Sequence, residues 1–119
     1  MAKGDDIEER LIDFGVRIIK LANQLPKDRA GGHLSGQILR SGSSPAAHYA
    51  EARGAESTND FIHKLKLCLK ELNETRVWLK MIIRSEMQSG EKMTNILTEG
   101  DELCRIINAS IKTTQTKQK

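Results

Sequence analysis

Residues 61–83 read FIHKLKLCLKELNETRVWLKMII, and this stretch decides the fold. Its core-type side chains recur at alternating spacings of four and three, which places them in one stripe along a helix. The stripe consists of Phe61, Leu65, Cys68, Leu72, Thr75, Leu79 and Ile82. Ser57 and Asp60 precede it with the S-x-x-D pattern of a capping box, which starts helices. The sequence therefore predicts a long amphipathic helix over residues 57–85.

The same alternation recurs on both sides of this helix. Apolar residues from Ile7 to Leu25 predict a helix over residues 5–24, which ends before Pro26 because proline disfavours helical geometry in the residue before it. Apolar residues from Met93 to Ile111 predict a helix over residues 90–112. Residues 113–119 contain no apolar side chain, so we expect a frayed tail there.

The segment between the first and third helices is less regular. Leu34, Ile38 and Leu39 predict a helix over residues 32–53, after a turn that contains two adjacent glycines. A run of small residues from Ser41 to Ala47 would let a neighbouring backbone approach closely. Pro45 interrupts this run, and it should bend or open the helix because it removes one internal hydrogen bond.

Four helices joined by short connections predict one all-α domain over residues 1–119. Short connections place consecutive helices antiparallel, and steps of four and three favour crossing angles of about 20°. The expected architecture is an up-down-up-down antiparallel four-helix bundle.

The charge of the chain gives little reason to expect general attraction to a polyanion. The net charge of +3 equals the contribution of Lys112, Lys117 and Lys119, so residues 1–111 are neutral on balance. Aromatic residues are only 3% of the chain, which disfavours platforms for stacking bases. The sequence has no export signal and no run of about 20 apolar residues that could span a membrane. We therefore expect a cytoplasmic protein.

Residues with catalytic or metal-binding chemistry do not form a recognisable motif. Cys68 and Cys104 lack CxxC spacing and lie on core stripes, which favours a packing role. The three histidines lie on different predicted segments, and Glu71 and Glu74 lack the Glu-x-x-His partners of di-metal bundles. No glycine-rich phosphate loop is present. The sequence therefore predicts no metal, no cofactor and no enzymatic activity.

The helix over residues 57–85 has a second face with segregated charges. Five cations fall within an arc of about 120° when residues are placed at about 100° intervals. They are Lys66, Lys70, Arg76, Lys80 and Arg84. Beside them, Ile62, Leu69 and Ile83 repeat at heptad spacing, and Arg76 fills the remaining position.

Three interpretations of this face stay open. The long cationic side chains can cover the rim of an ordinary bundle. Alternatively, Ile62, Leu69, Arg76 and Ile83 form the seam of a homo-oligomer, in which the guanidinium fixes the register. A third possibility is a nucleic-acid groove, because five cations can neutralise several phosphates.

A family resemblance extends over most of the chain. The segment from Gln37 to Leu79 and the segment Asn108–Thr113 resemble the four-helix-bundle family related to proteins encoded in intervening sequences of bacterial large-subunit ribosomal RNA genes. In the first segment, the resemblance is carried by Gln37–Ser44, Ala47–Tyr49, Arg53, Ser57, Asp60–Ile62, Lys64, Leu65, Glu71, Glu74, Trp78 and Leu79.

The resemblance implies a left-turning antiparallel bundle that assembles as a ring-like homopentamer without assigned enzymatic activity. The accessory protein of diversity-generating retroelements is similar to this family, which implies RNA, DNA or a nucleic-acid-processing protein as a partner besides a second copy of the chain. Shared polar and aromatic positions are expected to be structural, with Arg40 or Arg53 paired to Glu71 or Glu74. They are Arg40, Tyr49, Arg53, Glu71, Glu74 and Trp78.

Overall fold

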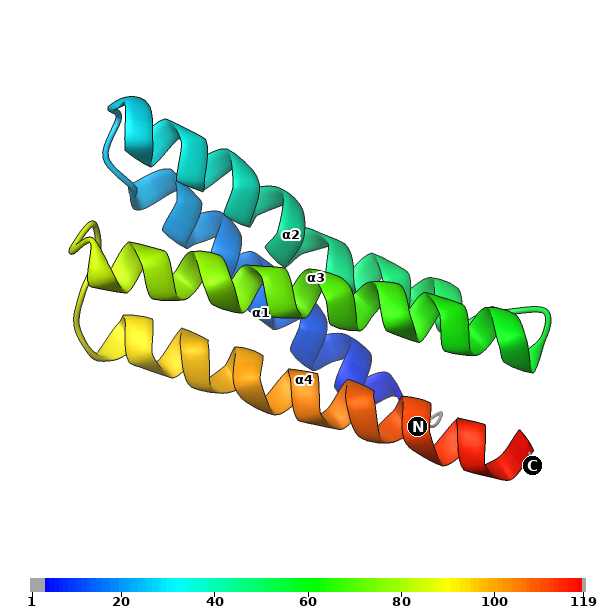
Figure 1. Cartoon of the computed structure of the whole chain (residues 1–119). Coiled ribbons are helices and arrows are strands. Elements are labelled where there is room, and N and C mark those ends of the chain that lie inside the picture. The colour runs from blue at the N-terminus through cyan, green and yellow to red at the C-terminus, as the bar shows by residue number, and fades with distance from the viewer. Residues whose placement is uncertain (1–3, 119) are drawn as a thin grey trace.

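The computed structural model describes residues 4–118, which form four α-helices. These are α1 (Asp5–Gln24), α2 (Arg29–Arg53), α3 (Thr58–Arg84) and α4 (Glu91–Gln118). Figure 1 shows that consecutive helices run in opposite directions, so α1 begins and α4 ends at the same end of the molecule. Residues 4–118 contain no β-strand. The prediction of an all-α four-helix bundle is confirmed.

Side-chain caps fix where the two central helices begin. The Asp28 carboxylate accepts a hydrogen bond from the Gly31 backbone N–H at 2.8 Å, so α2 begins at Arg29 rather than at the predicted Gly32. A carboxylate at this position satisfies an amide that has no partner within the first turn. At α3, Ser57 accepts from the Asp60 N–H at 3.0 Å, as its capping-box pattern predicts.

The predicted frayed tail over residues 113–119 is wrong for residues 113–118, because α4 continues to Gln118, and Lys119 lies outside the described residues. The hydroxyls of Thr114 and Thr116 donate to the carbonyl oxygens of Ser110 and Lys112, one turn back. The Gln118 amide also donates to the Asn59 side chain at 2.9 Å, which joins the end of α4 to the start of α3. Polar residues therefore extend this helix without an apolar stripe of their own.

Close backbone approach sets the packing of α1 against α2. Gly42 lies where a Cβ atom would collide with the buried Ile18 side chain, and Gly15 faces the Gly42 carbonyl oxygen. α2 continues through Pro45, and the hydroxyls of Ser43 and Ser44 donate to carbonyl oxygens of the preceding turn. The small-residue run thus acts as the predicted notch.

The core is mainly aliphatic, as the low aromatic content requires. Its most buried large side chains are Leu11, Phe14, Ile18, Leu21, Ile38, Leu65, Leu72, Leu79, Ile82, Met93, Ile96 and Leu103. Thr75 is the one polar member of the predicted stripe on α3, and its hydroxyl lies 2.8 Å from that of the buried Ser41 on α2. This hydrogen bond satisfies both hydroxyls inside the core.

The bundle is least closed between α1 and α4. Contacts between these two helices are much sparser than those of the other neighbouring pairs. A groove of about 800 Å³ opens at the end where α4 terminates, and its lining includes Tyr49, Arg53, Phe61 and Ile106. In residues 4–118, no helix has an apolar stretch long enough to cross a membrane.

Candidate interaction surface

The predicted basic stripe on α3 divides into two environments. Lys66, Lys70, Lys80 and Arg84 are exposed. Arg76 is half-buried, and its Nε lies 2.5 Å from Asp101 Oδ1 on α4. Burial is the largest single influence on the Arg76 guanidinium and lowers its pKa, but the hydrogen bond and charge of Asp101, together with the interactions with Cys104, outweigh burial, so the pKa is raised. The structure thus leaves four of the five predicted cations facing solvent and uses Arg76 to join α3 to α4.

The predicted oligomer seam is largely covered within one chain. Ile62 is only 7% exposed and belongs to the core. Leu69 and Ile83 are partly buried and pack against that core. Leu69 also lies beside Arg76 and Cys104 at the junction of α3 and α4. Most of the apolar area along this predicted seam is therefore buried within a single chain and is not available for contact with a second copy.

Exposed apolar area lies instead on other faces, which the sequence interpretation missed. Large hydrophobic side chains that are 40–48% exposed occur on α1, α2 and α3. They are Ile12, Val16, Ile19, Leu39, Val77 and Met81. The signal was present in the sequence, because Ile12, Val16 and Ile19 follow spacings of four and three along a second stripe of α1.

Arg40 forms an ionic clamp between α2 and α3. Its guanidinium contacts Glu71 at 3.0 Å and also pairs with Glu74. The Trp78 indole N–H donates to the same Glu74 carboxylate at 3.1 Å. The predicted pairing of Arg40 is confirmed, and the four side chains Arg40, Glu71, Glu74 and Trp78 form one network between α2 and α3.

The other predicted arginine joins a different pair of helices. Arg53 contacts Asp5 at 2.7 Å and Glu8 at 3.1 Å, so it links the end of α2 to the start of α1. Arg10 links α1 to α4 through Glu99 at 2.8 Å and Glu102 at 3.1 Å. Hydrogen bonds to these acids raise the pKa of Arg10. Ion pairs therefore join α1 to both of its neighbouring helices, α2 and α4.

The cysteines are buried free thiols, as expected for core positions. Burial raises the pKa of Cys68 to about 12 and also raises the pKa of Cys104. A protonated thiol is a poor nucleophile and a poor metal ligand. Within the described part of the chain, no three His, Cys, Asp or Glu side chains converge as a metal site.

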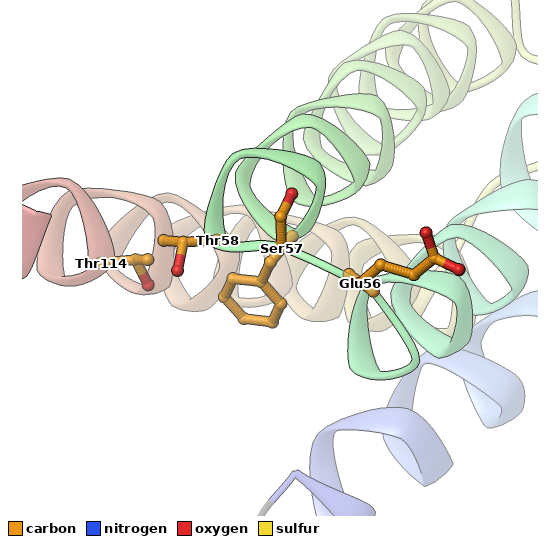
Figure 2. A pocket seen from close by; sticks show the side chains of 6 residues that line it. Glu56, Ser57, Thr58 and Thr114 are labelled. Atoms are coloured by element: carbon orange, nitrogen blue, oxygen red, sulfur yellow. The ribbon is translucent and has the colours of Figure 1, made fainter.

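A shallow pocket of about 380 Å³ lies where the α2–α3 connection meets α4. Figure 2 shows that Thr58 and Thr114 face each other across it, whereas the Glu56 carboxylate points away from both hydroxyls. A hydroxyl nucleophile needs a base within hydrogen-bond reach, and the labelled side chains do not provide that arrangement. The pocket is lined by three residues with neutral hydroxyls, Ser57, Thr58 and Thr114, beside the half-buried Phe61.

Comparisons with known proteins identify the family. No curated protein matches the chain. A crystal structure of a protein with unknown function from the S23 ribosomal protein family of Bacteroides thetaiotaomicron is 38% identical, with a TM-score of 0.83. The match covers 89% of this chain and 98% of that one. The model of the 23S rRNA-intervening sequence protein family matches residues 5–109. The chain therefore belongs to the 23S rRNA-intervening sequence protein family.

Proposed function

We propose that this protein is a non-catalytic homo-oligomeric scaffold. The observation that carries the proposal is the set of half-exposed aliphatic side chains on helices that are otherwise well packed, above all Ile12, Val16 and Ile19 on α1. Aligned apolar side chains on an isolated subunit mark surfaces that become covered by a partner. Burial of this stripe in an assembly would remove its apolar area from water.

The resemblance described above implies a ring of five subunits, which we adopt as the proposed assembly. Ion pairs at Arg10, Arg40 and Arg53 join helices within one chain, so these contacts do not require a second copy. Two free thiols fit the reducing cytoplasm in which we place the protein.

Sedimentation velocity at tens of micromolar protein tests the assembly directly. We expect a single species with about five times the 13.3 kDa chain mass. A species at the chain mass would contradict the scaffold proposal. A defined assembly with another subunit count would retain the scaffold and replace the pentamer.

A second candidate function is nucleic-acid binding by the exposed cations of α3. Lys66, Lys70, Lys80 and Arg84 face solvent, and within residues 4–118 none of them forms an ion pair with a carboxylate. Cations on one helix face can contact successive phosphates. The family name connects relatives of this chain with a ribosomal RNA gene, which makes RNA the first ligand to test.

Binding of fluorescent RNA or DNA across a salt series tests this candidate. Phosphate contacts predict a linear fall of the logarithm of affinity with the logarithm of salt concentration. Lys66→Gln combined with Lys70→Gln should weaken binding and reduce the slope. Lys20→Gln combined with Lys27→Gln, which removes two exposed cations elsewhere, is the matched control. Absence of binding at low salt would exclude this candidate.

A further inference from the structure

We propose that a second copy of this chain docks the outward face of its α1 on the outward face of α3, so that subunits join head to tail. This inference rests on the proposed homo-oligomeric function and specifies the two surfaces that meet. The surfaces are called here the α1 face and the α3 face. The α1 face comprises Asp6, Glu9, Ile12, Asp13, Val16 and Ile19, and the α3 face comprises Lys66, Lys70, Val77, Lys80, Met81 and Arg84.

Both faces have aliphatic side chains at their centres. Ile12, Val16 and Ile19 are 40–42% exposed on α1, and Val77 and Met81 are each 48% exposed on α3. Ile12 and Val16 are separated by one helical turn, as are Val77 and Met81, so the two pairs can interdigitate when the helices pack side by side. Each face alone is small, but the two together form a continuous apolar contact.

The charges beside these centres are opposite over the first half of α1, whereas the exposed cation Lys20 follows Ile19 at the other end of the α1 face. Asp6, Glu9 and Asp13 are exposed on the first half of α1. The α3 face carries the four exposed cations of the basic stripe instead. Within residues 4–118, none of these seven side chains forms an ion pair with another residue of its own chain. Acidic and basic faces of this kind attract each other, whereas two identical copies of either face would repel.

The neighbouring helix extends the α1 face. Gly42 packs against Ile18, and α1 and α2 are antiparallel, so this register places Leu39 beside the turn that contains Ile19. Leu39 is 42% exposed, and the adjacent Gly36 has open space where a side chain would project. Leu39 therefore adds exposed apolar area on the helix next to the α1 face.

The position of the two helices in the bundle makes the contact heterologous. Each of α1 and α3 packs against α2 and α4, but no Cα atom of α1 comes within 8 Å of a Cα atom of α3, so the two helices lie diagonally across the bundle. Their outward faces thus belong to different sides of one subunit and cannot be satisfied within it. A contact between two different faces repeats from subunit to subunit, and it closes into a ring when the rotation between copies allows it.

Two charge variants test the contact by sedimentation velocity. The first variant, Ile12→Lys with Val16→Lys, places cations opposite the basic α3 face. The second variant, Val77→Glu with Met81→Glu, places carboxylates opposite the acidic α1 face. Each variant alone should sediment as a 13.3 kDa chain with an unchanged circular dichroism spectrum, because all four positions are at least 40% exposed.

Mixing the two variants provides the decisive measurement. A mixture should associate into species heavier than either variant alone, because each junction between the two variants pairs two unaltered faces or the introduced lysines with the introduced glutamates. Strict alternation of two variants cannot close a ring of five, so the expected products are mixed dimers, longer open chains and rings with an even number of subunits. A chain with Asn95→Lys and Thr98→Lys, two exposed positions of α4, is the matched control and should keep the wild-type mass. A wild-type assembly in which either variant alone keeps its full mass, or a folded mixture that stays monomeric, would overturn this contact and leave the scaffold proposal intact. A monomeric wild-type chain would instead contradict the scaffold itself.

Discussion

At the scale of single residues, Arg40 connects two helices through one guanidinium. The Glu71 side chain that it contacts is only 12% exposed, so loss of Arg40 leaves a carboxylate with reduced access to water. Removal of one partner of such a pair costs more than the pair itself contributes, because the remaining charge keeps its desolvation penalty. Arg40 is itself half-exposed, which moderates the effect through solvent screening.

We therefore predict that Arg40→Met lowers the free energy of unfolding by about 1 kcal/mol. Glu71→Gln in the Arg40→Met background should cost less than it does in the wild-type chain, since the two side chains act as a unit. Urea unfolding monitored by circular dichroism measures both quantities. Arg29→Met, at an exposed position of the same helix, is the control and should change stability by less than about 0.5 kcal/mol. Equal losses at the two arginines would contradict the clamp.

The buried thiol of Cys68 makes stability depend on alkaline pH. Its pKa is raised from 9.0 to about 12 by burial, so an unfolded chain releases this proton at a lower pH than the folded chain does. Between these values the unfolded state binds fewer protons, and the free energy of unfolding falls as pH rises. Below pH of about 8 both states keep the proton and the thiol makes no pH-dependent contribution.

We predict that this thiol lowers the free energy of unfolding by up to about 1.4 kcal/mol for each pH unit above its usual pKa. Urea unfolding at pH of about 8 and about 10 measures the loss. Cys68→Ala should lose less stability between the two pH values than the wild-type chain, whatever its stability at the lower pH. The same loss in both chains would show that other groups are responsible.

At the scale of helices, the packing of α1 on α2 depends on one glycine. A Cβ atom at Gly42 would lie 2.5 Å from Ile18 Cγ2 and 2.9 Å from Ile18 Cβ, and the Ile18 side chain is fully buried. Such an atom near the branch point of a side chain cannot be accommodated by rotation of a flexible end. The two helices would have to separate, which disrupts the core on both sides.

Gly42→Ala should therefore lower the free energy of unfolding by about 1–3 kcal/mol, although alanine is the better helix former. Gly36 lies in the same helix with open space around it, so Gly36→Ala should raise the free energy of unfolding by about 0.5–1 kcal/mol. Opposite signs in urea unfolding would confirm that contact rather than helix propensity decides the first result. Stabilisation by both changes would refute the close approach.

At the scale of the whole molecule, positive and negative charges nearly balance in number but lie on different parts of the surface. Residues 1–111 are neutral overall, yet the first half of α1 has exposed acids and α3 has exposed cations. A neutral total weakens general attraction to a polyanion, whereas segregated faces favour oriented association. The same cations serve both candidate functions, so subunit docking and nucleic-acid binding would compete for them.

Assembly predicts that stability depends on protein concentration. An oligomer dissociates when its chains unfold, so the urea midpoint should rise as chain concentration increases from about 1 μM to about 100 μM. The Ile12→Lys and Val16→Lys chain should show a constant midpoint over this range if it remains monomeric. A constant midpoint for the wild-type chain would indicate that assembly contributes no stability.

The periodic sequence by itself determined the fold class. Stripes at spacings of four and three predicted three of the four helices, a less regular apolar pattern predicted the second, and the Ser57 cap predicted the start of α3, because these signals act within a few residues along the chain. The start of α2 and the end of α4 differ from the prediction. Asp28 and Gln118 determine these ends through side-chain hydrogen bonds, which a pattern of apolar residues does not indicate.

Only the tertiary structure decided which apolar stripe is covered. On α3, the heptad-spaced Ile62 is buried in the core, and Leu69 and Ile83 pack against its edge. On α1, by contrast, Ile12, Val16 and Ile19 stay half-exposed. Both stripes look equivalent in sequence, since periodicity reports the faces of one helix but not the position of its neighbours. The close approach of Gly42 to Ile18 and the ion pair between Arg76 and Asp101 join residues that are far apart in the chain, and they help to set where neighbouring helices lie. The positions of the helices then determine which side chains are buried.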